Sequence, residues 1–390
     1  MDKKHLLLAA VLSIFTTGCA ITNQYEVAEY EPLLEHRLPE ISVFYLKASD
    51  AFYQACEDFN RSSTQKHCEI NNIDLRSIKD VFQETELFER VTLADQTADY
   101  KLLITSATYT HNTAEDGASA YLAGATLLMA PVSITQTIKL DVSLQWLDLE
   151  VERYQLDIPF TRKISLLSLN QDTRLDIAKS VSSHLLQRFQ EEDSFSAAVI
   201  AGRLESADYG AQLELPERVA PHIKEASHVY HHPLHGAQTR YIHEIFDFEF
   251  IDVFVYPIRQ TDWRDHRRSL AIEAQNFRDE LMAFQREGEI NNLMFEQEQY
   301  HLWSIGDQDL TVIHVPVTFR DADNVDHNSH CYIFIQQDQF IKIRSSFADT
   351  SADAPDLETF TRAIASTIKV PGESPFMAQL RHYWQASAPK

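Results

Sequence analysis

Histidine is the residue type whose number and spacing most suggest a chemical role. The chain has 17 histidines, and six of them lie between His222 and His243. The segment HVYHHPLHG includes His231, His232 and His235, and neutral imidazoles crowded in this way can bind zinc, nickel or copper. The spacing matches no standard ligand set, because HExxH is absent and adjacent residues of a strand point to opposite faces. We therefore expect a solvated loop, with metal binding by these three histidines as the alternative.

Side chains that could catalyse hydrolysis form no recognisable pattern. No serine stands in a GxSxG sequence, and no CxxC pair occurs. Cys331 follows His330, but neighbours in a strand face apart. Only nine glycines occur, with neither GxGxxG nor GxxxxGK, so the familiar nucleotide-binding loops are missing. We expect no catalytic residue, no cofactor and no enzymatic activity.

The first residues are typical of an export signal. Lys3 and Lys4 precede an apolar run from Leu6 to Phe15, and small residues then lead to Cys19. The run has about half of the roughly 20 residues that a membrane-spanning helix needs. We therefore expect a leader that is removed, and not a permanent span.

The residues before Cys19 resemble the lipobox of bacterial lipoproteins. In that motif a small residue such as Gly18 precedes a cysteine that is acylated and becomes the new N-terminus, and Thr16 stands where the family usually has leucine. The resemblance implies a signal peptide over residues 1–18 and a palmitate-type lipid anchor on Cys19. It also implies an outer-membrane location facing the periplasm, because no aspartate follows the cysteine closely. Ordinary cleavage after Ala20, giving a soluble secreted protein, is the alternative.

The other three cysteines predict one disulfide. An oxidising envelope would favour pairing two of them. Cys56 and Cys68 close a short polar loop, and a bridge there would remove roughly 3 kcal/mol of loop entropy from the unfolded chain. Cys331 lies in the apolar run SHCYIFIQ, so we expect it to be a buried, unreactive thiol.

Size and charge limit the architecture and the partners. A chain of 390 residues with 44% apolar content can form two domains, each with a core. The net charge of −24 repels nucleic acid and anionic lipid, so we expect no nucleic-acid partner.

The segment 40–195, which follows a tether over residues 19–39, predicts an α+β domain. ISVFYLK at 41–47 is typical of a strand, and TIKLDVSLQWLDL alternates apolar and polar side chains, as in a strand with one buried and one wet face. Two helices are predicted by apolar side chains at helical spacing. The first has Leu75, Ile78, Phe82 and Thr85, and the second, near 171–190, has Leu175, Ala178, Leu185 and Phe189. The order indicates helices packed on an antiparallel sheet.

The phrase VFQETELFERV followed by ADYKLLI resembles a pattern of small envelope lipoproteins, in which a helix leads into a strand opened by Ala-Asp-Tyr. That similarity implies an anchored assembly or accessory protein and assigns no functional residue.

An apolar stretch, residues 117–134, connects two long strands of this domain. Hairpin connections are normally short and polar, so GASAYLAGATLLMAPVSI needs an explanation. One explanation is a buried helix that covers the sheet. The other is an exposed patch that dips into the membrane or docks an envelope protein partner. The side chains of that patch would be Tyr121, Leu122, Leu127, Leu128 and Met129.

A linker over residues 196–220 and a second α+β domain over 221–390 are expected next. Its strand-like runs are 238–246, 249–257, 311–319, 331–336 and 339–347, and its two helices have apolar stripes over 270–284 and 357–368. The order of elements resembles the small PsbP/Mog1-like binding modules, with FIKIRSSF as the only echo in sequence.

These features predict a membrane-anchored envelope lipoprotein that acts as a non-catalytic accessory, scaffold or binding protein. The alternative is a metal-binding or metal-dependent envelope protein that uses the histidine-rich segment 222–243. A deep pocket in the second domain would favour ligand binding over protein docking.

Overall fold

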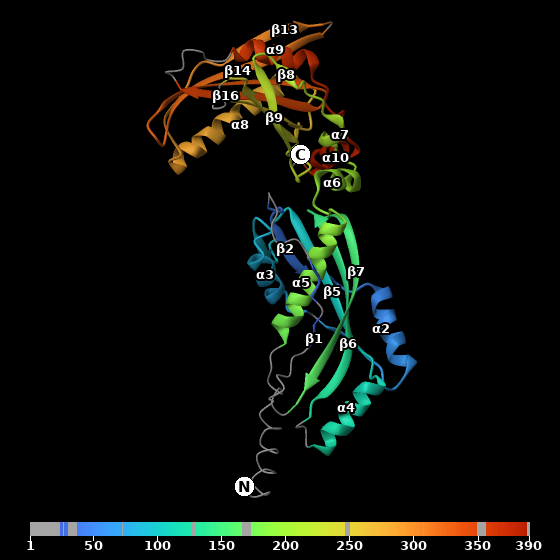
Figure 1. The fold of residues 1–390 in the computed structure, drawn as a ribbon. Helices are drawn as coiled ribbons and strands as arrows, with labels where there is room; N and C mark the ends of the chain where they lie inside the picture. The colour runs from blue at the N-terminus through green and yellow to red at the C-terminus, as the bar shows by residue number, and fades with distance from the viewer. Residues whose placement is uncertain are drawn as a thin grey trace, which may run out of the picture. The chain divides into compact units, whose positions relative to one another are not determined.

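The fold is that of a computed structural model, shown in Figure 1. The structure describes residues 24–25, 27–29, 37–71, 73–126, 130–165, 173–245, 250–306, 308–348 and 356–387. The chain divides into two compact units, residues 1–194 and 195–390. Each unit is an antiparallel-dominated sheet packed with helices, which confirms the predicted α+β class.

Unit 1 is built on a sheet with the strand order β1-β7-β6-β5-β2-β4, and β3 also pairs with β5. The strands are β1 (Gln24–Tyr25), β2 (Ile41–Tyr45), β3 (His67–Asn71), β4 (Val91–Leu93), β5 (Tyr100–Thr110), β6 (Val132–Trp146) and β7 (Leu149–Ile164). Strand β2 runs parallel to β4 and β5, whereas β5, β6 and β7 are antiparallel. The expectation of a wet face on β6 was wrong at Asp141 and Ser143, which are buried because Arg153 and Glu150 bind them from β7.

The described helices of unit 1 are α2 (Asp50–Ser62), α3 (Leu75–Glu84), α4 (Ala114–Ala125) and α5 (Arg174–Glu191). Helices α3 and α5 lie against the sheet in Figure 1 and pack against each other. The predicted stripe of α3 is buried at Leu75, Ile78 and Phe82. In α5 the predicted stripe fails at Leu175, which is 47% exposed because it lies in the first turn, before the packed stretch that begins at Ala178.

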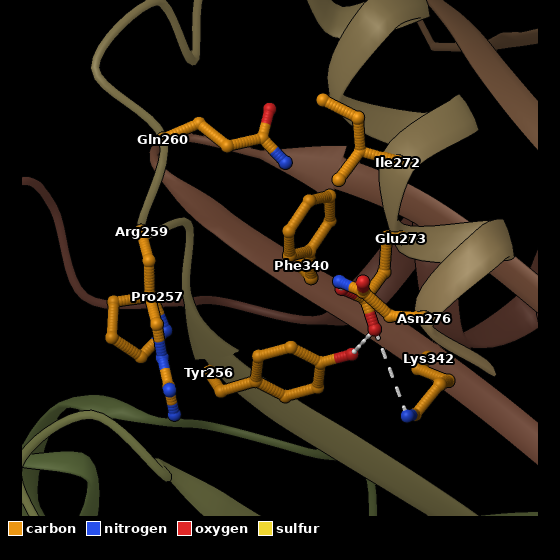
Figure 2. Close-up of a pocket in the computed structure, with 9 residues that line it drawn as sticks. All are labelled: Tyr256, Pro257, Arg259, Gln260, Ile272, Glu273, Asn276, Phe340 and Lys342. Carbon is orange, nitrogen blue, oxygen red and sulfur yellow. Dashed lines mark hydrogen bonds and ion pairs between the residues drawn. The ribbon is translucent and has the colours of Figure 1, made fainter. Parts of the chain in front are cut away.

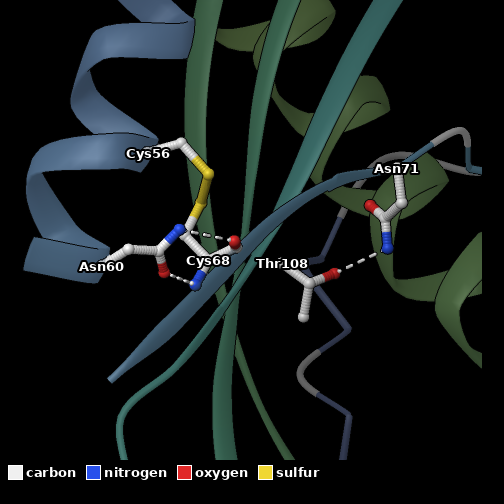
Figure 3. Close-up of a disulfide and its surroundings, with 5 residues drawn as sticks. All are labelled: Cys56, Asn60, Cys68, Asn71 and Thr108. Atoms are coloured by element: carbon white, nitrogen blue, oxygen red, sulfur yellow. Dashed lines mark hydrogen bonds between the residues drawn. A yellow bond between two sulfur atoms is a disulfide. The ribbon is translucent and has the colours of Figure 1, made fainter. Parts of the chain in front are cut away.

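The predicted disulfide joins Cys56 and Cys68, whose Cα atoms are 5.4 Å apart. Figure 3 shows that it links α2 to β3, so part of the expected loop is helical. Asn60 completes this corner, because its side-chain oxygen accepts from the backbone N–H of Cys68 at 2.5 Å and its amide donates to the Cys68 carbonyl at 3.1 Å. The bridge therefore holds the edge strand β3 to a helix that has few other buried side chains.

Unit 2 is built on a sheet with the strand order β12-β14-β15-β16-β11-β10-β9-β8, and β13 also pairs with β14. Its strands are β8 (Arg218–Val219), β9 (His222–Val229), β10 (Ala237–His243), β11 (Phe250–Pro257), β12 (Ile290–Phe295), β13 (Gln299–Ile305), β14 (Gln308–Asp321), β15 (Asp326–Gln336) and β16 (Gln339–Ala348). Helices α8 (His266–Glu287) and α9 (Leu357–Thr367) cover opposite faces, each over its own apolar cluster (Figure 1). Cys331 lies in the cluster under α8, which confirms its expected burial, and this burial raises the pKa of its thiol to about 12.

Three segments of unit 2 differ from expectation. Residues 196–220, expected as a linker, contain α6 (Ala197–Leu204), α7 (Tyr209–Gln212) and β8. The ends of the histidine-rich segment form β9 and β10, whereas residues 230–236, with His231, His232 and His235, form the loop between these strands. The sequence also gave no expectation of the last helix, α10 (Pro375–Ser387).

Candidate functional site

A pocket of about 360 Å³ lies between α8 and strands β11 and β16 of unit 2 (Figure 2). This volume is within the lower range of small-molecule sites. Its lining residues are Tyr256, Pro257, Arg259, Gln260, Ile272, Glu273, Asn276, Phe340 and Lys342.

Helix α8 positions the acidic wall of this pocket. The Asp265 side chain caps the helix by accepting from the backbone N–H of Arg268, and Gly288 ends the helix in the left-handed conformation. The apolar stripe between these caps includes Leu270 and Phe277, and Glu273 lies on the same face at helical spacing. A carboxylate is thereby carried into the interior, where Glu273 is only 7% exposed.

Both oxygens of the Glu273 carboxylate accept a hydrogen bond. The Tyr256 hydroxyl donates to Oε1 at 2.5 Å, and the Asn276 amide donates to Oε2 at 3.0 Å. Burial, together with the charge of Glu273, raises the pKa of Tyr256 well above its ordinary value, so this hydroxyl stays protonated and remains a donor. Figure 2 shows the three side chains converging on one wall. The carboxylate is therefore held in one orientation.

Lys342 supplies the opposite charge from β16. Its Nζ lies 3.7 Å from Glu273 Oε1 and 3.6 Å from Glu280 Oε2. The side chain is 13% exposed and lies over the ring of Tyr256 at 5.4 Å, so aromatic and carboxylate groups both stabilise the cation. A buried charge pair with such partners is costly to assemble, and it gives the pocket a fixed polarity.

The loop after β11 forms the other wall. The side-chain oxygen of Gln260 is buried and has no hydrogen-bond partner among the described residues. Arg259 is exposed at the same loop, and one of its N–H groups donates to the Leu234 carbonyl at 3.0 Å. Buried acceptors are nearly always satisfied, so Gln260 calls for a donor supplied by water or by a ligand.

This arrangement is suited to binding a small polar molecule. A ligand with hydroxyl or ammonium donors could satisfy Gln260 and approach Glu273, while Phe340 and Ile272 offer apolar contacts. The sequence analysis missed this site. The available signal was Glu273 itself, a carboxylate inside the apolar stripe of a helix.

The three candidate metal ligands occupy the segment that follows β9. The Nδ1 atom of His231 is hydrogen-bonded to the Phe195 carbonyl, and the rings of His232 and His235 stack with their centroids 4.1 Å apart. Burial, followed by the charges of His235 and Arg259, lowers the pKa of His232 to about 3, so it is neutral. Among the residues that the structure describes, no group of three or more His, Cys, Asp or Glu side chains is placed to hold a metal ion.

The remaining candidate residues belong to the leader and to unit 1. Cys19 lies outside the described residues, as do Leu127, Leu128 and Met129. Tyr121 and Leu122 lie on α4 and are 80% and 57% exposed. Within the described ranges, no helix is both long and apolar enough to cross a membrane.

Comparison with known proteins gives fold similarities only. No family model matches the chain, and no curated protein matches it. Similar solved structures include the solution structure of PsbP from the cyanobacterium Synechocystis, with 13% identity, a TM-score of 0.29, and coverage of 41% of this chain and 94% of that chain. They also include a crystal structure from Bacteroides thetaiotaomicron, with 9% identity, a TM-score of 0.25, and coverage of 43% of this chain and 50% of that chain. The solved structures that resemble part of this chain thus include a PsbP protein. At these TM-scores the similarity supports no conclusion about function.

Proposed function

We propose that this protein is a non-catalytic binding protein of the bacterial envelope, anchored by a lipid on Cys19. The leader and the lipobox-like residues support the anchor. The alternative of metal binding rests on composition, and no contact among the described histidines favours it.

From this anchor we infer that the protein lies at the outer membrane, with its folded units facing the periplasm.

The pocket under α8 carries the binding part of this proposal. Its central observation is that Gln260, whose buried side-chain oxygen has no partner among the described residues, and Glu273, whose carboxylate is buried, line the same cavity. The function is then to hold a small polar ligand that has hydrogen-bond donors, and to present it or respond to it in the envelope. We propose no chemical step, because both oxygens of Glu273 already accept hydrogen bonds.

A pair of variants on α8 tests the pocket. Ile272 lines the pocket and is 37% exposed, whereas Met282 lies outside the lining and is 38% exposed. We expect Ile272→Trp to fill the cavity and Met282→Trp to leave it open. The measurement is native mass spectrometry of the full chain from envelope membranes, followed by thermal melting with millimolar amino acids, polyols and sugars. Retention or stabilisation that Ile272→Trp removes and Met282→Trp keeps would support the proposal. Equal behaviour of the two variants would refute it.

A further inference from the structure

Helix α4 presents an uncharged outer face, although almost a quarter of the residues in the chain are charged. Its acidic residues, Glu115 and Asp116, are confined to the first turn, and its last turn has no basic residue. Tyr121 and Leu122 point outward and are 80% and 57% exposed, whereas Ala123 is buried. Two large apolar side chains that adjoin on a helix face without charges form a continuous apolar surface, the kind that can contact another body.

The position of α4 on the sheet is fixed by side chains of its inner face. The buried Asp116 carboxylate accepts from the backbone N–H and the hydroxyl of Thr135, both at 3.1 Å. One turn later, the Ser119 hydroxyl accepts from the backbone N–H of Ser133 at 2.8 Å. Thr135 and Ser133 belong to the first residues of β6, so α4 is clamped to the end of the sheet at which β6 begins (Figure 1).

The N-terminal chain enters the sheet at this same end. Gln24 of β1 is paired with Thr161 of β7, and Thr161 is paired with Thr135 of β6. Two strand spacings, about 10 Å, therefore separate Gln24 from a residue that α4 contacts. Strand β1 is antiparallel to β7, so Gln24 lies nearer than Tyr25 to the end of β7 at Ile164, which is paired with Val132 at the start of β6.

The length of chain between Cys19 and Gln24 sets the distance to the membrane. The five Cα–Cα steps from Cys19 to Gln24 can span at most about 18 Å. A lipid on Cys19 would thus hold the bilayer within that distance of β1, at the end of unit 1 where α4 exposes Tyr121 and Leu122. Arg162, paired with Ile134 at this end, is exposed and can approach lipid phosphates.

We propose that the outer face of α4 is a second membrane contact, which inserts Tyr121 and Leu122 into the interface of the bilayer that carries the Cys19 lipid. This inference rests on the proposed anchor. A second contact beside the lipid anchor would strengthen the attachment and fix how unit 1 faces the bilayer. The occupant of this surface is the lipid bilayer, and a mature chain that does not bind vesicles would point to a protein partner instead.

The test uses the non-acylated mature chain that begins at Ala20 and contains every described residue. Its binding to phosphatidylcholine vesicles, with and without phosphatidylglycerol, is measured by flotation. We expect Tyr121→Ser with Leu122→Ser to lower the partition coefficient at least tenfold, because two inserted apolar side chains are lost. The matched control is Ile245→Ser with Met294→Ser in unit 2, which removes two side chains of 77% and 64% exposure and should leave the partition coefficient unchanged.

Equal loss of vesicle binding in the two double variants, or no vesicle binding by the mature chain, would overturn the inference. Circular dichroism confirms that each variant is folded, as expected for exposed positions. The anchor is tested separately by mass spectrometry of residue Cys19 in the full chain expressed in a Gram-negative bacterium. An unmodified cysteine would overturn the anchor, whereas the vesicle assay, which uses no acyl chain, reports on α4 alone.

Discussion

Replacement of Arg381 should destabilise unit 2 more than any surface substitution, because Arg381 neutralises a fully buried carboxylate. Arg381 lies on α10 with 5% of its side chain exposed, and its Nη2 is 2.9 Å from Oδ2 of Asp338, which is 0% exposed. The guanidinium also donates to the Ile258 carbonyl and to Glu373. Ile258 lies between Pro257 and Arg259, so this ion cluster also holds the loop that forms one wall of the pocket.

The magnitude follows from leaving Asp338 unpaired. Truncation of one partner of a buried ion pair costs about 3–5 kcal/mol. After Arg381→Ala the Gln339 amide, at 2.7 Å, would be the one remaining side-chain donor to the Asp338 carboxylate among the residues that the structure describes. We expect a loss of about 4 kcal/mol in the free energy of unfolding. With a urea m-value of about 2 kcal/mol/M, the unfolding midpoint should fall by about 2 M.

The assay is urea unfolding followed by tryptophan fluorescence, because the ring of Trp263 lies 5.3 Å from the Arg381 guanidinium. The matched control is Lys369→Ala, which breaks an exposed 2.6 Å ion pair with Glu214 and should cost less than about 1 kcal/mol. Substituting Asp338→Leu together with Arg381→Met should recover part of the loss, since no buried charge then remains unpaired. Equal costs for Arg381→Ala and Lys369→Ala, or strict additivity in the double variant, would refute the reasoning.

Three further predictions concern other parts of the chain. Cys56→Ser with Cys68→Ser should lower the free energy of unfolding of unit 1 by about 3 kcal/mol, and dithiothreitol should then have no further effect on urea unfolding. Burial, together with neighbouring histidines, lowers the pKa of His314 to about 4, so the unfolded chain binds more protons between pH 6.5 and 4. Stability should therefore fall by about 2 kcal/mol as the pH drops through this window, and His314→Gln should flatten the profile. Asp116→Asn should weaken the clamp of α4, seen as faster amide exchange in α4 with unchanged exchange in α5.

The periodicity of apolar residues predicted the helices and strands whose pattern is regular or whose packing partners are close in sequence. The stripe of α8 and the alternation of β14 follow directly from the spacing of their apolar residues. Helix α4 was harder to predict, because Gly117 and Gly124 interrupt any apolar stripe and the outer face of the helix is not polar. A capping box, in which Thr113 and Asp116 exchange hydrogen bonds, was the sequence signal for that helix.

Charged residues explain most of what could not be predicted. Arg381 and Asp338 look like surface residues in the sequence, since charged side chains are seldom buried. Their burial depends on α10 reaching the turn between β15 and β16, and that contact joins segments far apart along the chain. The same reason applies to Asp141 in unit 1, which Arg153 covers from the next strand. Whether such a charged residue is buried depends on its tertiary contacts, which no local sequence pattern predicts.

The pocket combines two departures from the usual rules of a protein interior. Glu273 places a carboxylate in the apolar stripe of α8, where an alanine or leucine would pack without the cost of desolvation. Gln260 leaves a buried oxygen without a partner among the described residues. Each departure alone can be explained without a ligand, by a structural ion pair at Glu273 or by an ordered water at Gln260. Both residues line one cavity, and exceptions to packing rules tend to gather where a protein binds something, so a bound ligand would explain them together.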